Sequence, residues 1–309
     1  MASKKNAVIL PKLLGMVFLI LSILSSTSIY VIFKLINHYK VHTFSTIVVN
    51  YLAACIAGFF LSNSKQFSFS IFFENWFPIS ALIGVLFIIM FYVIAKSTQK
   101  VGVAVTTVAV KMSVVVPIAF SIWYDTADVL TLLKSLGIVL AILSVFLTVY
   151  RKNTQKINAN TILLPAFLFI GMGIVDSCVK FAQSAFVTND LTSVFSTMVF
   201  ASALISGILV LPFSKNALAS YRFTKTWIFG IILGLVNFGS MYFLILALNY
   251  VDISTGVQAM GSIVFGINNI GIVALSVIAG FIMFNERPSR LNWIGITLSC
   301  GAIIVLMFS

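Results

Sequence analysis

Residues 133–150 read LKSLGIVLAILSVFLTVY, and residues 291–308 read LNWIGITLSCGAIIVLMF. The two stretches align without a gap, which pairs Gly137 with Gly295. Each has the length and apolar character of a membrane-spanning helix, because a bilayer core of roughly 30 Å takes about 20 helical residues. The chain therefore contains the same kind of helix twice.

The similarity extends beyond this helix. At the same offset Asp128 lies opposite Glu286, and MFYVI (90–94) corresponds to MYFLI (241–245). We interpret the two acids as anchors of the connections in which they lie. The sequence thus predicts two repeats, which are residues 1–156 and residues 157–309.

The composition places both repeats in a membrane. Of the 309 residues 61% are hydrophobic and 8% are charged, whereas a soluble domain carries about 25% charged residues. Ten apolar runs are long enough to span a bilayer: 11–33, 44–62, 76–95, 101–124, 129–150, 161–186, 191–213, 226–248, 254–284 and 290–308. Each repeat holds five of them, and because five is odd the second copy enters the membrane in the opposite orientation. The predicted fold is an all-α integral membrane protein with ten transmembrane helices in a 5+5 inverted repeat, an architecture typical of secondary transporters.

The loop charges predict the orientation. We call the side of the N-terminus side A and the opposite side B. Side B carries twelve Lys and Arg residues, side A carries five, and Glu286 is the single acid on side B. The positive-inside rule therefore predicts a cytoplasmic side B, with both termini outside. We interpret the net charge of +12 as this bias in the loop charges. We expect no nucleic-acid partner.

The segment GFIMFNERPSRLNWIGITLSCGAIIVLMF (280–308) resembles the closing stretch of an EamA-type repeat of the drug/metabolite transporter superfamily. In that pattern an acid after an apolar helix is followed by a helix that starts near a glycine. The first half departs from it, since WYDTADVLTLLKSLG has Asp128 where the usual residue is Glu. The resemblance implies export or exchange of small metabolites through a central cavity lined by the first, third, fourth, sixth, eighth and ninth spans. It also implies cytoplasmic termini, which is contrary to the charge count.

Lys111 lies near the middle of the fourth span, in TTVAVKMSVVVPIAFSIW (106–123). A charge at this depth costs on the order of 3 kcal/mol on insertion scales. We expect Lys111 to be a counter-charge for an anionic part of the substrate. A structural lysine bonded to carbonyls or to a buried acid is the alternative.

The equivalent residue in the ninth span is Asn269, next to Asn268 in VFGINNIGIV. The run 254–284 is too long for one straight crossing, since about 31 helical residues measure roughly 46 Å. We predict a break or bend within 265–272, because interrupted helices at matching positions mark binding sites in transporters. Two amides that join neighbouring helices are the alternative.

The sixth span holds Asp176 and Lys180, four residues apart and so on one helix face. Either the two charges neutralise each other, or Asp176 carries a coupling proton or binds a substrate amine. Weaker candidates for the substrate site are Tyr92 and Asn237. Asn50, Tyr51 and Tyr242 are equally weak candidates. For each of these five residues the alternative is a packing role.

Together these features predict a secondary transporter of a small polar metabolite, amino-acid-like, zwitterionic or anionic, that works by alternating access in a bacterial cytoplasmic (inner) membrane. The expected partners are the substrate, the bilayer and a coupling proton or counter-substrate, and a homodimer is left open. No cofactor, metal site or enzymatic activity is expected, because the sequence offers no cluster of His, Cys and carboxylates and no ATP-binding loop. A lipid-carrier flippase, a broad drug exporter and a non-transporting scaffold are the alternatives.

Overall fold

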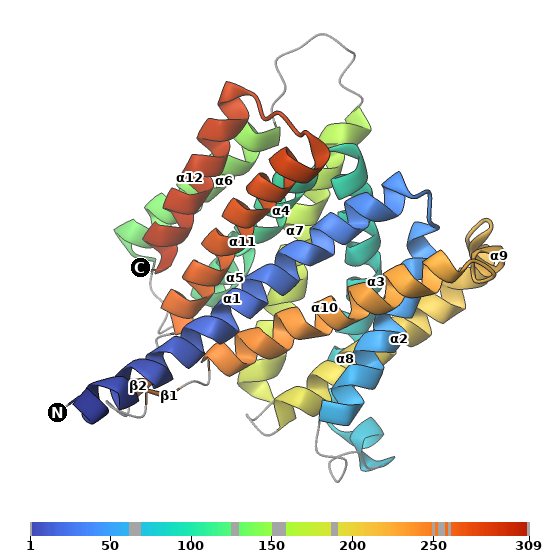
Figure 1. Cartoon of the computed structure of the whole chain (residues 1–309), viewed down its shortest axis with the longest axis horizontal. Helices are drawn as coiled ribbons and strands as arrows, with labels where there is room; N and C mark the ends of the chain where they lie inside the picture. Colours follow the sequence, from blue (N-terminus) through green and yellow to red (C-terminus); the bar gives the residue numbers. More distant parts are fainter. Residues whose placement is uncertain are drawn as a thin grey trace.

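The structure is a computed structural model that describes residues 2–61, 69–124, 130–149, 159–186, 191–248, 251–252, 257–258 and 261–307. It consists of α-helices joined by short connections (Figure 1). In chain order the α-helices are α1 (Ala2–His38), α2 (Thr43–Leu61), α3 (Phe77–Lys100), α4 (Val103–Met112), α5 (Val115–Tyr124), α6 (Leu132–Val149), α7 (Ala159–Ala185), α8 (Thr192–Val210), α9 (Ala217–Ser220), α10 (Thr224–Leu248), α11 (Gly261–Phe284) and α12 (Arg290–Met307).

Short elements complete the described chain. They are the 3-10 helices η2 (Phe69–Phe73) and η4 (Leu211–Phe213), and the strands β1 (Val251–Asp252) and β2 (Val257–Gln258). The two strands pair antiparallel, with Val251 opposite Gln258. This small hairpin occupies the start of the run 254–284, so α11 begins only at Gly261 and fits one membrane crossing.

The protein is a helical membrane protein. Seven helical segments of the described chain are long and apolar enough to cross a bilayer, and three shorter apolar helices accompany them at 132–148, 163–179 and 290–306. Large apolar side chains lie exposed on many helices, including Phe60 and Phe146. An exposed apolar surface of this extent is typical of contact with lipid.

Helices that are distant in sequence pack side by side. α6 packs along α12 at one edge of the molecule, and α2 packs along α8 (Figure 1). α1 contacts α10 and α11, while α7 contacts α3, α4 and α5. Under the proposed repeat α7 corresponds to α1, α3 to α10, and α4 with α5 to α11, so each contact of α1 with the second half has a counterpart made by α7 with the first half.

The contact between α6 and α12 is reciprocal. A Cβ atom added to Gly137 of α6 would meet the side chain of Leu306 of α12. A Cβ atom added to Gly295 of α12 would meet Thr148 of α6. The gapless alignment that pairs Gly137 with Gly295 also pairs Thr148 with Leu306. Equivalent residues therefore make the same close approach from both sides, as a two-fold relation requires.

The interior is divided into apolar clusters. The largest lies among α1, α2, α3, α8 and α10 and includes Phe33, Tyr51 and Phe200. A second cluster joins α4, α6, α11 and α12 around Val108 and Ile303. The region between α1, α4, α7 and α11, where the candidate charges lie, is bounded by both clusters.

Candidate functional site

The fourth span is interrupted next to Lys111. α4 ends at Met112, α5 begins at Val115, and Pro117 explains the interruption because it has no N–H to donate to the Ser113 carbonyl. The N–H of Val116 donates to that carbonyl instead, over 2.9 Å, and the Ser113 hydroxyl donates back to the carbonyl of residue 110. The interruption thus exposes the C-terminal end of α4 inside the bundle.

Lys111 lies in the last turn of α4, beside an acid of α7. Ser113 donates from Oγ to Oδ2 of Asp176 over 3.4 Å. The charges of Lys111 and Asp176 interact, yet they form no ion pair within 4 Å, and the one such pair between described side chains joins Lys34 and Glu286. Neither charge is therefore engaged in a direct ion pair with the other.

We define the Lys111 cluster as Lys111, Ser113 and Asp176. Two further features lie next to it. Tyr30 of α1 is 5% exposed and lies close enough to Asp176 to interact with its charge. The carbonyl end of a helix carries a partial negative charge, so the end of α4 stabilises the Lys111 ammonium. Together with Tyr30, the cluster therefore combines a cation, a carboxylate and two hydroxyl groups from three separate segments.

The asparagines of α11 lie in regular helix. α11 runs without interruption from Gly261 to Phe284, so the predicted break within 265–272 is wrong, while the predicted bend stays a prediction. Gly271 has a packing role instead, because a Cβ atom added there would meet the side chain of Ile23 of α1. Within the described residues of the two corresponding spans, the fourth span is interrupted at Ser113 and Val114, whereas α11 is continuous.

Asn268 retains the properties of a candidate binding residue. It is 3% exposed, and its Oδ1 atom has no hydrogen-bond partner in the described structure. Asn269 is half-buried on the same helix, and α11 packs against α4. A buried amide oxygen without a donor is costly, so a ligand N–H or O–H that reaches it would be bound favourably.

The remaining predicted residues lie elsewhere or cannot be compared. Lys180 belongs to α7 one turn after Asp176, and its side chain lies outside the described part of the structure. The side-chain amides of Asn237 of α10 and Asn50 of α2 lie 3.2 Å apart, which is the helix–helix contact expected as the alternative role of Asn237. Tyr92 is 38% exposed and lines a separate pocket.

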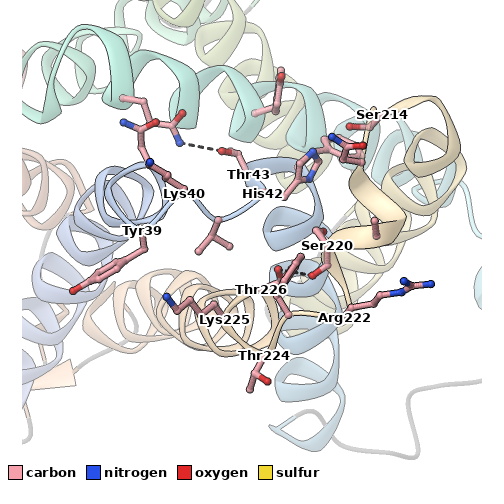
Figure 2. A pocket seen from close by; sticks show the side chains of 18 of the residues that line it. Tyr39, Lys40, His42, Thr43, Ser214, Ser220, Arg222, Thr224, Lys225 and Thr226 are labelled. Atoms are coloured by element: carbon pink, nitrogen blue, oxygen red, sulfur yellow. Dashed lines mark hydrogen bonds between the residues drawn. The ribbon is translucent and has the colours of Figure 1, made fainter.

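The pocket lined by Tyr92, which we call the basic pocket, has a volume of about 1070 Å³. Its walls come from the end of α1, the start of α2, the end of α3 and the segment from Ser214 to Thr226. Figure 2 shows Lys40 and Lys225 on one side, with His42 beside Ser214 on the other. The loop-charge count places the Lys and Arg residues of this pocket on side B and uses them only to predict orientation. In the structure these residues line one cavity.

Aromatic rings hold two of its lysines. The Lys96 ammonium lies 5.3 Å from the centre of the Tyr92 ring, and the Lys225 ammonium lies 5.8 Å from the centre of the Tyr39 ring. Among the described residues that line the pocket there is no Asp or Glu. The charged side chains among the described lining residues are therefore all cationic, and such a site concentrates anions.

His42 is fixed in the wall of the basic pocket. Its Nε2 donates to the Lys215 carbonyl over 3.1 Å, while its Nδ1 lies 2.8 Å from Oγ of Ser45. Burial lowers the pKa of His42, and the charge of Lys96 lowers it further, against the opposing effect of the Lys215 carbonyl. Burial and Lys96 thus both favour the neutral imidazole.

Glu286 anchors the connection between α11 and α12, as the sequence analysis expected. Both of its carboxylate oxygens accept a hydrogen bond from the Val103 N–H over 3.0 Å, at the start of α4. It also pairs with Lys34 of α1, whose Nζ donates to the Thr98 carbonyl of α3 over 3.3 Å. The corresponding acid, Asp128, lies outside the described residues.

Comparisons with known proteins name no activity for the chain. No family model matches the sequence. A protein of Haemophilus influenzae, described only as uncharacterized, is 28% identical over 300 residues, which cover 94% of this chain and 97% of that protein. A solved crystal structure of a protein aligns over 96% of each chain with a TM-score of 0.54 at 13% identity. The likeness to that structure concerns the fold alone.

Proposed function

We propose that the protein is a secondary transporter of the EamA type that moves a small anionic or zwitterionic metabolite by alternating access. The observation that carries this proposal is Lys111, which lies beside the interruption between α4 and α5 and interacts with the charge of Asp176 without forming an ion pair within 4 Å. A charge in the membrane interior is costly and is typical of a substrate or ion pathway. Interrupted helices at such a charge are a recurrent feature of transporter sites.

The repeat architecture belongs to the same proposal. Ten spans in two inverted halves agree with the seven long apolar helices and the three shorter ones, if α4 and α5 together form one span. The reciprocal contacts of Gly137 with Leu306 and of Gly295 with Thr148 support the two-fold axis. Two halves related in this way can alternate, one side closing while the other opens.

The roles within the site follow from charge. Lys111 binds the carboxylate or other anionic group of the substrate, and Asn268 offers its Oδ1 atom to a substrate N–H or O–H. Asp176 binds a substrate amine, or carries a coupling proton when the substrate has none. The proposed membrane is a bacterial cytoplasmic membrane, with the basic side B facing the cytoplasm.

The experiment that tests this proposal is a thermal-melting screen of the purified protein against amino acids, organic acids and phosphate esters, followed by uptake into proteoliposomes. We expect an anionic or zwitterionic compound to raise the melting temperature of the wild type and to be taken up. Lys111→Met should lose both effects while remaining folded. Stabilisation and uptake confined to hydrophobic cations would contradict the proposed substrate class.

A further inference from the structure

The basic pocket is a site distinct from the Lys111 cluster. None of Lys111, Ser113 and Asp176 lines it. Its volume of about 1070 Å³ is at the upper end of the range of ligand pockets, which is about 300–1,000 Å³. We infer that the basic pocket binds a small molecule with a doubly negative group, of the phosphate monoester class.

The positive charge of the lining favours a doubly negative ligand. Lys40, Lys96, Lys225 and Arg222 contribute positive charge, and none of the described lining residues is an acid that would balance it. Glu286, the single acid that the sequence places on side B, is already paired with Lys34. Like charges that share a pocket repel one another, and a dianion relieves this repulsion better than a single negative charge.

Two lysines of the pocket are positioned by cation–π contacts that leave N–H donors available. Lys96 and Lys225 lie over the rings of Tyr92 and Tyr39, so neither uses its N–H donors on a carboxylate. A ring face attracts an ammonium electrostatically and leaves its N–H groups free on the opposite side. Phosphate oxygens accept hydrogen bonds from such charged donors strongly. The pocket therefore presents positioned donors that the protein itself leaves available.

Lys40 has an unusual backbone conformation at the end of α1. α1 ends in a Schellman motif, in which Val41 N–H donates to the Ile36 carbonyl over 2.9 Å and Lys40 N–H donates to the Asn37 carbonyl over 3.1 Å. Lys40 takes the left-handed position of this motif, with φ of 53°, where glycine is the usual residue. A lysine is strained there, and its side chain lines the pocket. Strain at a charged lining residue is typical of a functional site.

The same phosphate chemistry is available from two sources. A water-soluble phosphate ester carries it, and so does the headgroup of an anionic phospholipid. Glycerol 3-phosphate and phosphatidic acid present the same phosphate monoester in soluble and lipid form. Titrating the purified full-length protein with each, in zwitterionic detergent and at constant ionic strength, separates the sources. Constant ionic strength is needed because salt screens such contacts.

We expect glycerol 3-phosphate to bind the wild type in isothermal titration calorimetry and to raise its melting temperature. Lys40→Gly should weaken binding about tenfold, the effect of losing about 1.4 kcal/mol. Its ligand-free melting temperature should stay equal or rise, because glycine suits the left-handed position. Lys225→Gln should weaken binding similarly. Arg290→Gln is the matched control, since Arg290 is exposed and does not line the pocket.

The outcomes separate this inference from the proposed transport. Lys111→Met should leave the affinity for glycerol 3-phosphate unchanged, because binding at the basic pocket does not involve the Lys111 cluster. Binding of phosphatidic acid alone, lost in Lys40→Gly, would support the pocket with a lipid headgroup as its ligand. Binding of neither compound would overturn the inference. Equal weakening by Arg290→Gln and Lys40→Gly would overturn it too, because the effect would then reflect net charge rather than the pocket.

Discussion

Glu286 and Lys34 form an ion pair of 3.0 Å that joins the connection after α11 to α1, and so the second half of the chain to the first. Both side chains are largely shielded from solvent, with exposed fractions of 17% and 23%. The same carboxylate caps α4 through the Val103 N–H. One acid thus holds three segments together on side B.

Glu286→Gln should destabilise the protein by about 1–3 kcal/mol, because a shielded Lys34 ammonium and the start of α4 both lose a charged partner. The melting temperature measures this effect. Glu74→Gln serves as the control, since Glu74 is exposed and an exposed substitution usually changes stability by no more than about 0.5 kcal/mol. If both variants melt together with the wild type, Glu286 does not anchor this side.

Gly102→Ala should also lower stability, for a conformational reason. Gly102 has φ of 115°, and an added Cβ atom would lie 2.9 Å from a carboxylate oxygen of Glu286. We expect a loss of about 1–3 kcal/mol, the range for a residue held in a strained backbone conformation.

Gly301→Ala is the matched control for this substitution. Gly301 is inside α12, and an added Cβ atom would meet nothing within 4 Å. Alanine in a helix interior is favoured over glycine by about 0.5–1 kcal/mol. The two substitutions should therefore shift the melting temperature in opposite directions, and a shift of the same sign would contradict the described geometry of Gly102.

The interruption at Ser113 can be tested through its cause. Pro117→Ala restores the N–H that regular helix requires, so α4 and α5 can join and carry Lys111 away from Asp176. We expect an equal or higher melting temperature together with slower uptake in proteoliposomes. Unchanged uptake at equal protein insertion would mean that the interruption does not position the site.

His42 predicts a pH dependence of stability. Its pKa in the folded protein lies below the usual value of about 6.5, chiefly because of burial. As the pH falls below about 6.5 the unfolded chain takes up the proton first, so His42 lowers stability between its ordinary and its folded pKa. The fall in melting temperature from pH 7.5 to pH 5.5 should be smaller in His42→Asn than in the wild type. Identical slopes in the two proteins would refute this assignment.

Much of the architecture could be predicted from the sequence, because it depends on local and repeated signals. The glycines at 137 and 295 and the long apolar runs predict a membrane protein with a repeated helix, and their reciprocal packing agrees with it. The Lys111 charge singled out its own position, since so few ionisable residues lie within the spans.

The site was harder to predict because its parts depend on tertiary contacts. Pro117 is a sequence signal for the interruption after α4, but the break was predicted near the asparagines of α11, in the other half of the chain. The basic pocket needs Lys40, Lys96 and Lys225 from three separate segments to meet. Charge counting assigns all three to one side but cannot indicate that they share one cavity.

The most direct test of the proposed function is counterflow transport by Lys111→Met, with the compound that gives the largest thermal shift in the substrate screen. Methionine keeps the length of the side chain and removes its charge, which relieves an insertion penalty, so the variant should insert and fold. We expect transport to fall by about tenfold or more, which corresponds to about 1.4 kcal/mol, with partial recovery in Lys111→Arg. If Lys111→Met instead melts early while transport per folded molecule is unchanged, Lys111 is a structural residue and the proposed substrate site is wrong.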